Sequence, residues 1–275
     1  MRIDAHQHFW KFHPVKNSWI KDDMKAIQKD FLPADLEPLL AQNDFGGCIA
    51  VQADQAESET DFLISLATGN DCIKGVVGWV DLQAADLTKR LAHYKACPIV
   101  KGFRHVLQGE PQRDLMLQPA FTKGIAALQH YGFTYDLLIL PDQVTFSTDL
   151  VTLFPEQKFV LDHLAKPYIR RREIAQWRND IELLGAHENV FCKLSGMVTE
   201  AHWHSSKKED FRSYIDVVIN AFGIDRIMFG SDWPVCLVAA SYREVVDIVE
   251  DYFLSFSKDE QDKIFGSNAE TFYGL

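Results

Sequence analysis

The sequence predicts an α/β protein: a (β/α)8 TIM barrel that forms a single domain and carries an additional C-terminal helix. Eight short runs rich in β-branched and aromatic residues recur along the chain, and a segment of helical character separates each run from the next. This alternation indicates parallel strands joined by crossover helices. The length of 275 residues also fits one such barrel, which typically needs about 250 residues. We therefore expect residues 1–275 to form one domain.

The expected strands are nearly continuous apolar runs, as is typical of parallel strands buried on both faces. They cover residues 2–8, 47–53, 74–81, 98–105, 134–140, 158–164, 190–195 and 226–232. A closed barrel places its first and last strands side by side, so the carboxyl ends of these two strands are predicted to meet.

Helical segments are expected between and after the strands. They cover residues 33–43, 57–69, 84–95, 119–131, 142–153, 171–187, 207–222 and 240–254. Pro33 suits a first helical turn. A last helix, over about 258–272, starts after Ser257, where Glu260 completes a capping-box pattern. We expect this last helix to pack on the outside of the barrel.

Residues 9–32 interrupt this regular order. They include Trp10 and Trp19 but few periodic apolar positions, and they follow the first expected strand on the presumed catalytic face. Long loops of this kind usually cover a site. Both tryptophans are therefore candidates for contact with a substrate.

Composition narrows the class of protein. The formal net charge is −11 and the sequence pI is about 5.3, which argues against nucleic acid or an anionic membrane as partner, since both need a clustered positive field. The basic run at 170–172 is interpreted as a solvated helix start. The five cysteines form no Cys-x-x-Cys pair, which favours reduced thiols. Without a recognisable signal peptide or an apolar span, the expected location is cytoplasmic.

Two histidines end the first expected strand. Side chains alternate between the faces of a strand, so His6 and His8 point the same way and both imidazoles can reach one centre. Two histidines on an exposed strand would look the same, but barrel enzymes keep their chemistry at the carboxyl ends of the strands. The pair therefore predicts metal binding or proton transfer.

Two further candidates are expected at the same end of the barrel. His163 ends the sixth expected strand and is either a core histidine or a site residue. Asp232 ends the eighth, in an apolar setting where a carboxylate needs a cation or several hydrogen bonds. Capping of the loop is the alternative for Asp232. Facing three histidines, it is better placed to accept a proton from water or to bind a metal.

The fourth expected strand ends in Lys101-Gly102-Phe103-Arg104-His105, which has more polar side chains than an apolar core needs. Arg104 offers a planar fork of donors for a carbonyl or carboxylate oxygen, and Lys101 and His105 are candidates for substrate binding; a surface ion pair is the alternative. Alternation places Lys101 and His105 on one face and Arg104 on the other, unless the strand bulges. Asp136, near the start of the fifth strand, is assigned to the stability face.

Five motifs together resemble the amidohydrolase superfamily, in particular its branch of sugar-lactone and dicarboxylate-lactone hydrolases, over nearly the whole chain. They are Ile-Asp-Ala-His-Gln-His-Phe-Trp, Lys-Gly-Phe-Arg-His, Leu-Asp-His-Leu-Ala-Lys-Pro, Lys-Leu-Ser-Gly-Met-Val-Thr-Glu-Ala and Phe-Gly-Ser-Asp-Trp-Pro-Val-Cys. The resemblance implies one divalent ion, with zinc as first choice, held by His6, His8, His163 and Asp232, or no metal at all. The fifth strand, 134–140, lacks the histidine or bridging lysine of many members, which argues against a two-metal centre.

The resemblance further implies a hydrolase that opens a sugar 1,4- or 1,5-lactone, of the L-fuconolactone or L-rhamnonolactone kind, to the aldonic acid. Asp232 would deprotonate the water, while a metal, or His163 with Arg104, would polarise the carbonyl. Trp10 and Trp19 would cover the sugar. Two alternatives stay open: a metal-dependent decarboxylase of an aromatic or enoic acid on the same scaffold, and a barrel that only binds sugar acids. Whether the chain forms a homo-oligomer also stays open.

Overall fold

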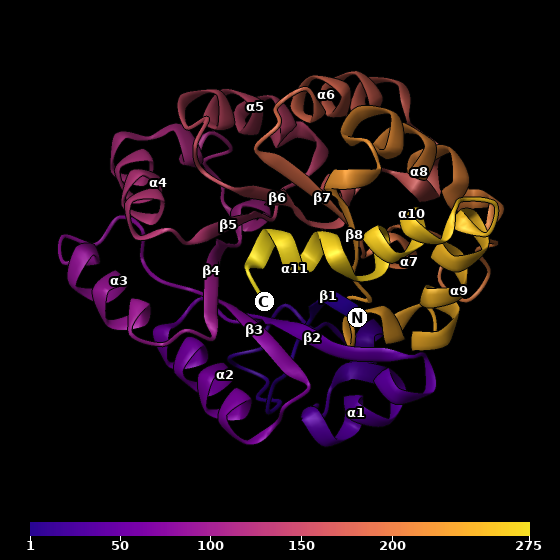
Figure 1. The fold of residues 1–275 in the computed structure, drawn as a ribbon, viewed down its shortest axis with the longest axis horizontal. Helices are drawn as coiled ribbons and strands as arrows, with labels where there is room; N and C mark the ends of the chain where they lie inside the picture. The colour runs from indigo at the N-terminus through magenta and orange to yellow at the C-terminus, as the bar shows by residue number, and fades with distance from the viewer.

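The computed structural model describes residues 1–275 and contains one sheet of eight parallel strands in the order β1 to β8. The strands are β1 Arg2–Gln7, β2 Phe45–Val51, β3 Ile73–Gly78, β4 Val100–His105, β5 Thr134–Leu137, β6 Phe159–Leu161, β7 Val190–Leu194 and β8 Ile227–Phe229. Gln7 forms a parallel bridge with Trp233, just beyond β8, so the first strand meets the chain that leaves the last. The predicted TIM barrel is confirmed (Figure 1).

Helices surround the sheet in chain order (Figure 1). They are α1 Pro33–Gln42, α2 Glu57–Gly69, α3 Leu87–Lys95, α4 Pro119–Tyr131, α5 Val144–Leu153, α6 Ala175–Gly185, α7 Met197–Glu200, α8 Glu209–Phe222 and α9 Tyr242–Phe253. Most lie within a few residues of their predicted bounds, and Pro33 begins α1 as expected. The four-residue helix α7 was not predicted, because a segment this short shows no helical periodicity.

Strands β6 and β8 end earlier than predicted. β6 ends at Leu161 and β8 at Phe229, so His163 and Asp232 lie in the loops that follow. Both residues have positive φ, 54° and 57° respectively, a region that non-glycine residues rarely occupy. The side chains of His163 and Asp232 are therefore directed by turns beyond the strand ends and not by the alternation of a regular strand.

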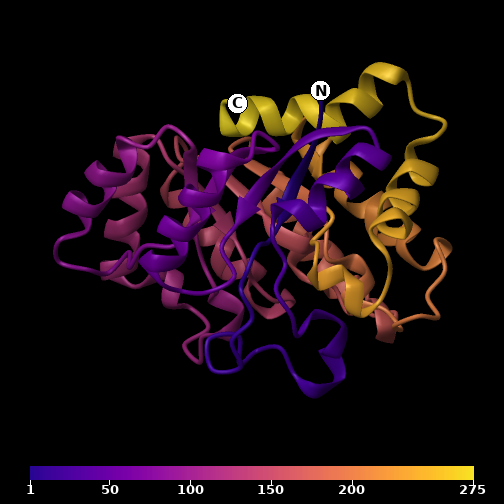
Figure 2. The ribbon, with the colours of Figure 1, turned by 90° about the horizontal axis from the view of Figure 1, so that it is seen from below.

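The C-terminal segment closes the end of the barrel at which the strands begin. It consists of α10 Lys258–Asp262, a π turn over Lys263–Ser267 and α11 Asn268–Tyr273, and Ser257 and Glu260 form the predicted capping box. The expectation that this segment packs on the outside is wrong. Apolar side chains of α11 join those of β1, β2, β3, β6 and β8 in one buried cluster, and α11 crosses the rim at which the chain starts (Figure 2). Its apolar face covers interior residues that would otherwise be open to water.

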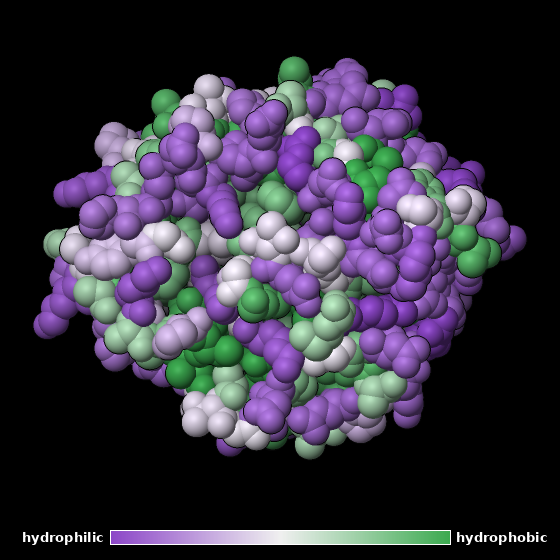
Figure 3. All heavy atoms as spheres, in the orientation of Figure 1, coloured by the Kyte–Doolittle hydropathy of each residue, from purple (hydrophilic) through white to green (hydrophobic).

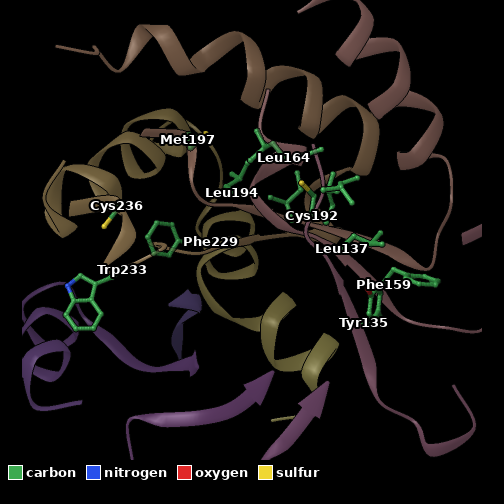
Figure 4. Packing of buried hydrophobic residues seen from close by; sticks show 14 of the residues in the cluster. Tyr135, Leu137, Phe159, Leu164, Cys192, Leu194, Met197, Phe229, Trp233 and Cys236 are labelled. Carbon is green, nitrogen blue, oxygen red and sulfur yellow. The ribbon is translucent and has the colours of Figure 1, made fainter. Parts of the chain in front are cut away.

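A second, larger core fills the layer between the strands and the helices. Figure 4 shows part of it; Tyr135, for example, packs edge-on against Phe159 of the neighbouring strand and against Phe121 of α4. The face that carries α11 is mostly hydrophilic, with apolar residues in small separate groups (Figure 3). None of the helices is both long and apolar enough to cross a membrane.

Candidate active site

An irregularity in β1 sets the direction of His6 and of His8, which directly follows the strand. The pairing of β1 with β2 shifts between Asp4 and Gln7, so the residues of this stretch do not follow simple alternation. The carboxylate of Asp4 fixes the local backbone: it accepts hydrogen bonds from the backbone N–H of His6 and of Ser231, at 3.2 and 2.9 Å, and from the Ser231 hydroxyl at 2.6 Å. Burial raises the pKa of Asp4 to about 6, and the bonds from Ser231 oppose this rise. Asp4 thereby ties the first strand to the loop that carries Asp232.

Four side chains meet at the carboxyl end of the barrel, and all of them are buried. Asp232 Oδ1 lies 3.3 Å from Nε2 of His8, 3.9 Å from Nε2 of His6 and 4.0 Å from Nε2 of His163. The two Nε2 atoms of His6 and His8 are 3.2 Å apart. The structure thus brings together three imidazoles and one carboxylate, as the sequence predicted.

Hydrogen bonds on the far side of the rings orient two of these imidazoles. His8 Nδ1 lies 2.8 Å from the carbonyl oxygen of Val51; because a carbonyl only accepts, Nδ1 carries a proton, and Nε2 is the nitrogen that faces the cluster. His163 Nδ1 is 2.8 Å from the Ser195 hydroxyl. Such outer bonds are characteristic of metal-ligating histidines.

The charge states suit a cation in the middle of the cluster. Burial lowers the pKa of His6 and of His163 well below the usual histidine value. Burial alone would raise the pKa of Asp232, but His163 and His8 outweigh it and the pKa is lowered. Three imidazoles and one carboxylate therefore converge at one buried place.

The ligand atoms of His6, His8 and Asp232 come close to the spacing around one tetrahedral zinc ion. Zinc binds imidazole nitrogen and carboxylate oxygen at 2.0–2.2 Å in tetrahedral geometry, which places neighbouring ligand atoms roughly 3.4 Å apart. The separations of 3.2 and 3.3 Å match this value, and those of 3.9 and 4.0 Å exceed it slightly. His6, His8 and Asp232 form one possible metal-binding group by the mutual distance of their ligand atoms, whereas His163 groups with His6 and Asp162.

Beneath the cluster lies a buried ion network that the sequence reasoning missed in part. Lys193 Nζ lies 2.5 Å from Asp136, 3.0 Å from Asp162 and 3.1 Å from Nδ1 of His6. Arg104 donates to Asp162 at 2.9 Å. Burial would raise the pKa of Asp162, but Lys193, His6 and Arg104 hold it well below the usual range. Burial raises the pKa of Asp136 to about 6 against the opposing charge of Lys193.

The assignment of Asp136 to the stability face is corrected in one respect: its side chain joins the network that holds His6. In the sequence, Asp136 could have been noticed as an acidic residue within an apolar strand. Lys193 gives the matching signal, a cation inside Val-Phe-Cys-Lys-Leu. Two opposite charges in strands that are buried on both faces must find partners in the interior. The sequence alone does not say that these two residues pair with each other.

Arg104 reaches the cluster, but Lys101 and His105 do not, so those two predictions are corrected. Lys101 Nζ donates to the carbonyl of Gly274 at 2.9 Å, near the chain end, because Lys101 lies at the start of β4, roughly 10 Å below Arg104 at ~3.3 Å per residue. His105 Nε2 lies 2.7 Å from Glu110, and its ring packs on Phe121 of α4. The alternation of β4 therefore turns His105 outward when Arg104 faces inward.

The loop after β1 projects from the end of the barrel opposite α11 (Figure 2), and it places Trp10 beside His8. Trp10 is buried, its ring centroid is 6.5 Å from that of His8, and its indole N–H donates to the carbonyl of Lys29. Trp19 packs edge-on against Trp10 and is 36% exposed. Trp10 is therefore the inner and Trp19 the outer aromatic of this loop.

A parallel eight-stranded barrel with a His-x-His pair after Ala5, a histidine beyond β6 and an aspartate beyond β8 defines a barrel hydrolase of the amidohydrolase type. The chain belongs to the Amidohydrolase family, whose sequence model matches residues 3–275.

Relatives within this family are similar over their full length. The chain is 38% identical to an L-fucono-1,5-lactonase of Burkholderia multivorans, over all of this chain and 96% of the relative. It is 34% identical to an L-fucono-1,5-lactonase of Burkholderia ambifaria, with the same coverage. A crystal structure of a Burkholderia multivorans amidohydrolase with bound zinc superposes with a TM-score of 0.96 at 39% identity, covering 100% of this chain and 99% of that one.

Proposed function

We propose that this protein is a sugar-lactone hydrolase that opens an L-fucono-1,5-lactone or a closely related aldonolactone to the aldonic acid. The observation that carries the proposal is the buried contact of Asp232 with three imidazoles at the catalytic rim. The full-length similarity to two L-fucono-1,5-lactonases supports the choice of substrate.

The metal is part of the proposal. His6, His8, His163 and Asp232 would hold one divalent ion, with zinc as first choice because a similar solved structure contains it. Such an ion, when bound, lowers the pKa of a water molecule and polarises a carbonyl.

The side chains of the chain supply the proton transfers. Asp232, which is ionised because of its lowered pKa, takes a proton from the attacking water. The new C–O bond forms at the lactone carbonyl, the bond from that carbon to the ring oxygen breaks, and Asp232 returns the proton to the departing ring oxygen. The product is the open aldonic acid, which loses its carboxyl proton to the solvent and becomes the aldonate.

The role of Arg104 differs from the expected direct contact with the carbonyl. Its guanidinium donates to Asp162 at 2.9 Å and to the carbonyl of Gln52 at 2.5 Å, and it lies 3.3 Å from Nε2 of His6. We assign it as a positioning residue, which holds His6 and Asp162 and keeps the negative charge below the cluster compensated.

The test is a pH-indicator assay on a panel of L- and D-aldonolactones with the parent protein and Asp232→Asn. L-Fucono-1,5-lactone is expected among the best substrates. The variant, which keeps the shape of Asp232, is expected to lose more than about a hundredfold in turnover, the usual contribution of a general base. Near-parental turnover by the variant would exclude Asp232 as the base, and an inactive parent on every lactone would exclude the function.

A further inference from the structure

Two charged residues lie next to the cluster, at the same end of the barrel, and take no part in the proposed proton transfers. Lys166 follows β6, three residues after His163, and Glu200 ends α7, the short helix after β7. Lys166 Nζ is 3.8 Å from Oε1 of Glu200, and both side chains are about three-quarters buried. The pair therefore belongs to the wall of the site and not to the outer surface.

A left-handed turn brings Lys166 to the side of His163. Four consecutive residues, His163 to Lys166, have φ between 51° and 58°, and the N–H of Lys166 donates to the carbonyl of His163 at 2.7 Å. Residues three apart in so tight a turn lie on the same side. Such a conformation costs L-residues roughly 1–2 kcal/mol each, so the surrounding structure holds it in place. The lysine and the histidine are thus presented together.

The short helix that carries Glu200, α7, begins against the ring of His163. Gly196, at the start of α7, lies so close to the His163 ring that an added Cβ would be 2.6 Å from Nδ1. Only a glycine allows α7 to approach this closely. Burial raises the pKa of Glu200, Lys166 opposes the rise, and the negative charge of Asp232 adds to it. Glu200 is therefore close enough to feel the charge of the proposed base.

The contact between Lys166 and Glu200 leaves hydrogen-bonding capacity unused. A separation of 3.8 Å is too long for a direct hydrogen bond, whereas one hydroxyl oxygen at the usual ~2.8 Å from each atom spans it. The ammonium of Lys166 forms no hydrogen bond within the chain, and the carboxylate of Glu200 receives only a 3.5 Å contact from Thr199. The Lys166 ammonium can thus donate, and the Glu200 carboxylate can accept, hydrogen bonds to a ligand placed between them.

The charges of this wall favour a neutral ligand. Lys166 and Glu200 cancel each other, and the nearby guanidinium groups are engaged: Arg104 with Asp162 and Gln52, Arg170 with the carbonyl of Ala201. Neither of these two guanidinium groups presents a free planar fork of donors to a substrate carboxylate. A polyhydroxylated ring fits better, because each hydroxyl both donates and accepts.

We propose that Lys166 and Glu200 are the residues that recognise hydroxyl groups of the substrate, and that together they select neutral sugar lactones over dicarboxylate lactones. This inference rests on the proposed lactonase function. Lys166 donates to a ring hydroxyl, and that hydroxyl or its neighbour donates to Glu200. Because these bonds form in the bound ground state as well as in the transition state, they lower KM more than they raise kcat.

The test compares Lys166→Met and Glu200→Gln with the parent on L-fucono-1,5-lactone and on δ-valerolactone, a six-membered lactone without hydroxyls. Each variant is expected to raise KM for the sugar lactone about 10- to 100-fold, the effect of losing a hydrogen bond to a charged group. At saturating sugar lactone, kcat should stay within about threefold of the parent, and δ-valerolactone turnover should be unchanged. Lys263→Met, which removes an exposed lysine paired with Asp225 far from this rim, is the matched control and should behave as the parent.

The outcomes separate the two proposals. A parent that hydrolyses no aldonolactone refutes the proposed function. A parent that is active, with variants whose KM for the sugar lactone is unchanged, refutes the role of the pair alone. Variants that lose kcat on the sugar lactone as severely as they gain KM also refute it, because the pair would then act on the reacting atoms or on the fold and not on the hydroxyl groups.

Discussion

Replacement of Lys193 by methionine tests whether the buried ion network holds the barrel together. The Lys193 ammonium lies 2.5 Å from Asp136, 3.0 Å from Asp162 and 3.1 Å from Nδ1 of His6, and the side chains of Lys193, Asp136 and Asp162 are fully buried. Methionine fills a similar volume without charge. Asp162 keeps Arg104 as a partner, whereas Asp136 keeps only the hydroxyl of Tyr273, at 3.2 Å.

The expected loss follows from the orphaned carboxylate. Removing one partner of a buried ion pair costs about 3–5 kcal/mol. In a domain of this size each kcal/mol lowers the unfolding temperature by about 2–4 °C, so Lys193→Met should lower it by roughly 6–20 °C. Neutralising the orphan in the double variant Lys193→Met/Asp136→Asn should restore a large part of this loss, because the two residues are coupled.

Thermal and urea unfolding followed by circular dichroism measure these changes, with Asp136→Asn completing the cycle. The reasoning is refuted if Lys193→Met unfolds within about 1 °C of the parent. It is also refuted if the double variant loses the sum of the two single losses, since the residues would then not be coupled.

Three further predictions concern separate parts of the molecule. Burial raises the pKa of Glu59 from 4.5 to about 7, so the unfolded chain loses this proton at lower pH than the folded protein. The stabilisation from protonated Glu59 is complete below pH 4.5 and is lost as pH rises through 7, by roughly 3 kcal/mol. Glu59→Gln should therefore reduce the fall in the free energy of unfolding between pH 4.5 and 8. An unchanged pH dependence of the free energy of unfolding would contradict the shift. Tyr273→Phe keeps the ring near Lys193 but removes the hydroxyl from Asp136, which should lower the free energy of unfolding by about 2 kcal/mol; a urea midpoint equal to that of the parent would show that the bond contributes nothing. Zinc at about 100 times its Kd should stabilise the parent by ~2.7 kcal/mol in thermal unfolding but not His8→Ala, and equal shifts in both would place the ion elsewhere.

The barrel could be predicted from the sequence because its strands are short, apolar and separated by helical segments. The positions of His6, His8 and Asp232 followed from the same logic, since strands of a barrel share one functional rim. The shift in β1 between Asp4 and Gln7 could not be predicted, because it depends on how Asp4 bonds to a loop more than two hundred residues away. The direction of the His163 side chain likewise depends on a left-handed turn over residues 163–166. The sequence does not indicate this turn, because the segment contains no glycine.

The parts that were missed depend on long-range pairing. Lys193 and Asp136 lie on different strands and meet only inside the closed barrel. The place of α11 was mispredicted because an amphipathic helix fits either the side or the end of a barrel, and the pattern alone does not distinguish these positions. Lys101 and His105 were misplaced because the motif Lys-Gly-Phe-Arg-His covers almost all of β4. Lys101 lies near the opposite end of the strand from the site, and His105 lies on the opposite face from Arg104.

Both chain ends emerge at the rim that α11 covers, opposite the catalytic loops, and Met1 and Leu275 are exposed there (Figure 2). A tether, a bead or a fused fluorescent protein attached at either end would project away from the entrance. The entrance of the active site would thus face the solution when the protein is immobilised. An attachment at Leu275 would need a flexible spacer, because Tyr273 contacts Asp136, Asp136 contacts Lys193, and Lys193 contacts His6.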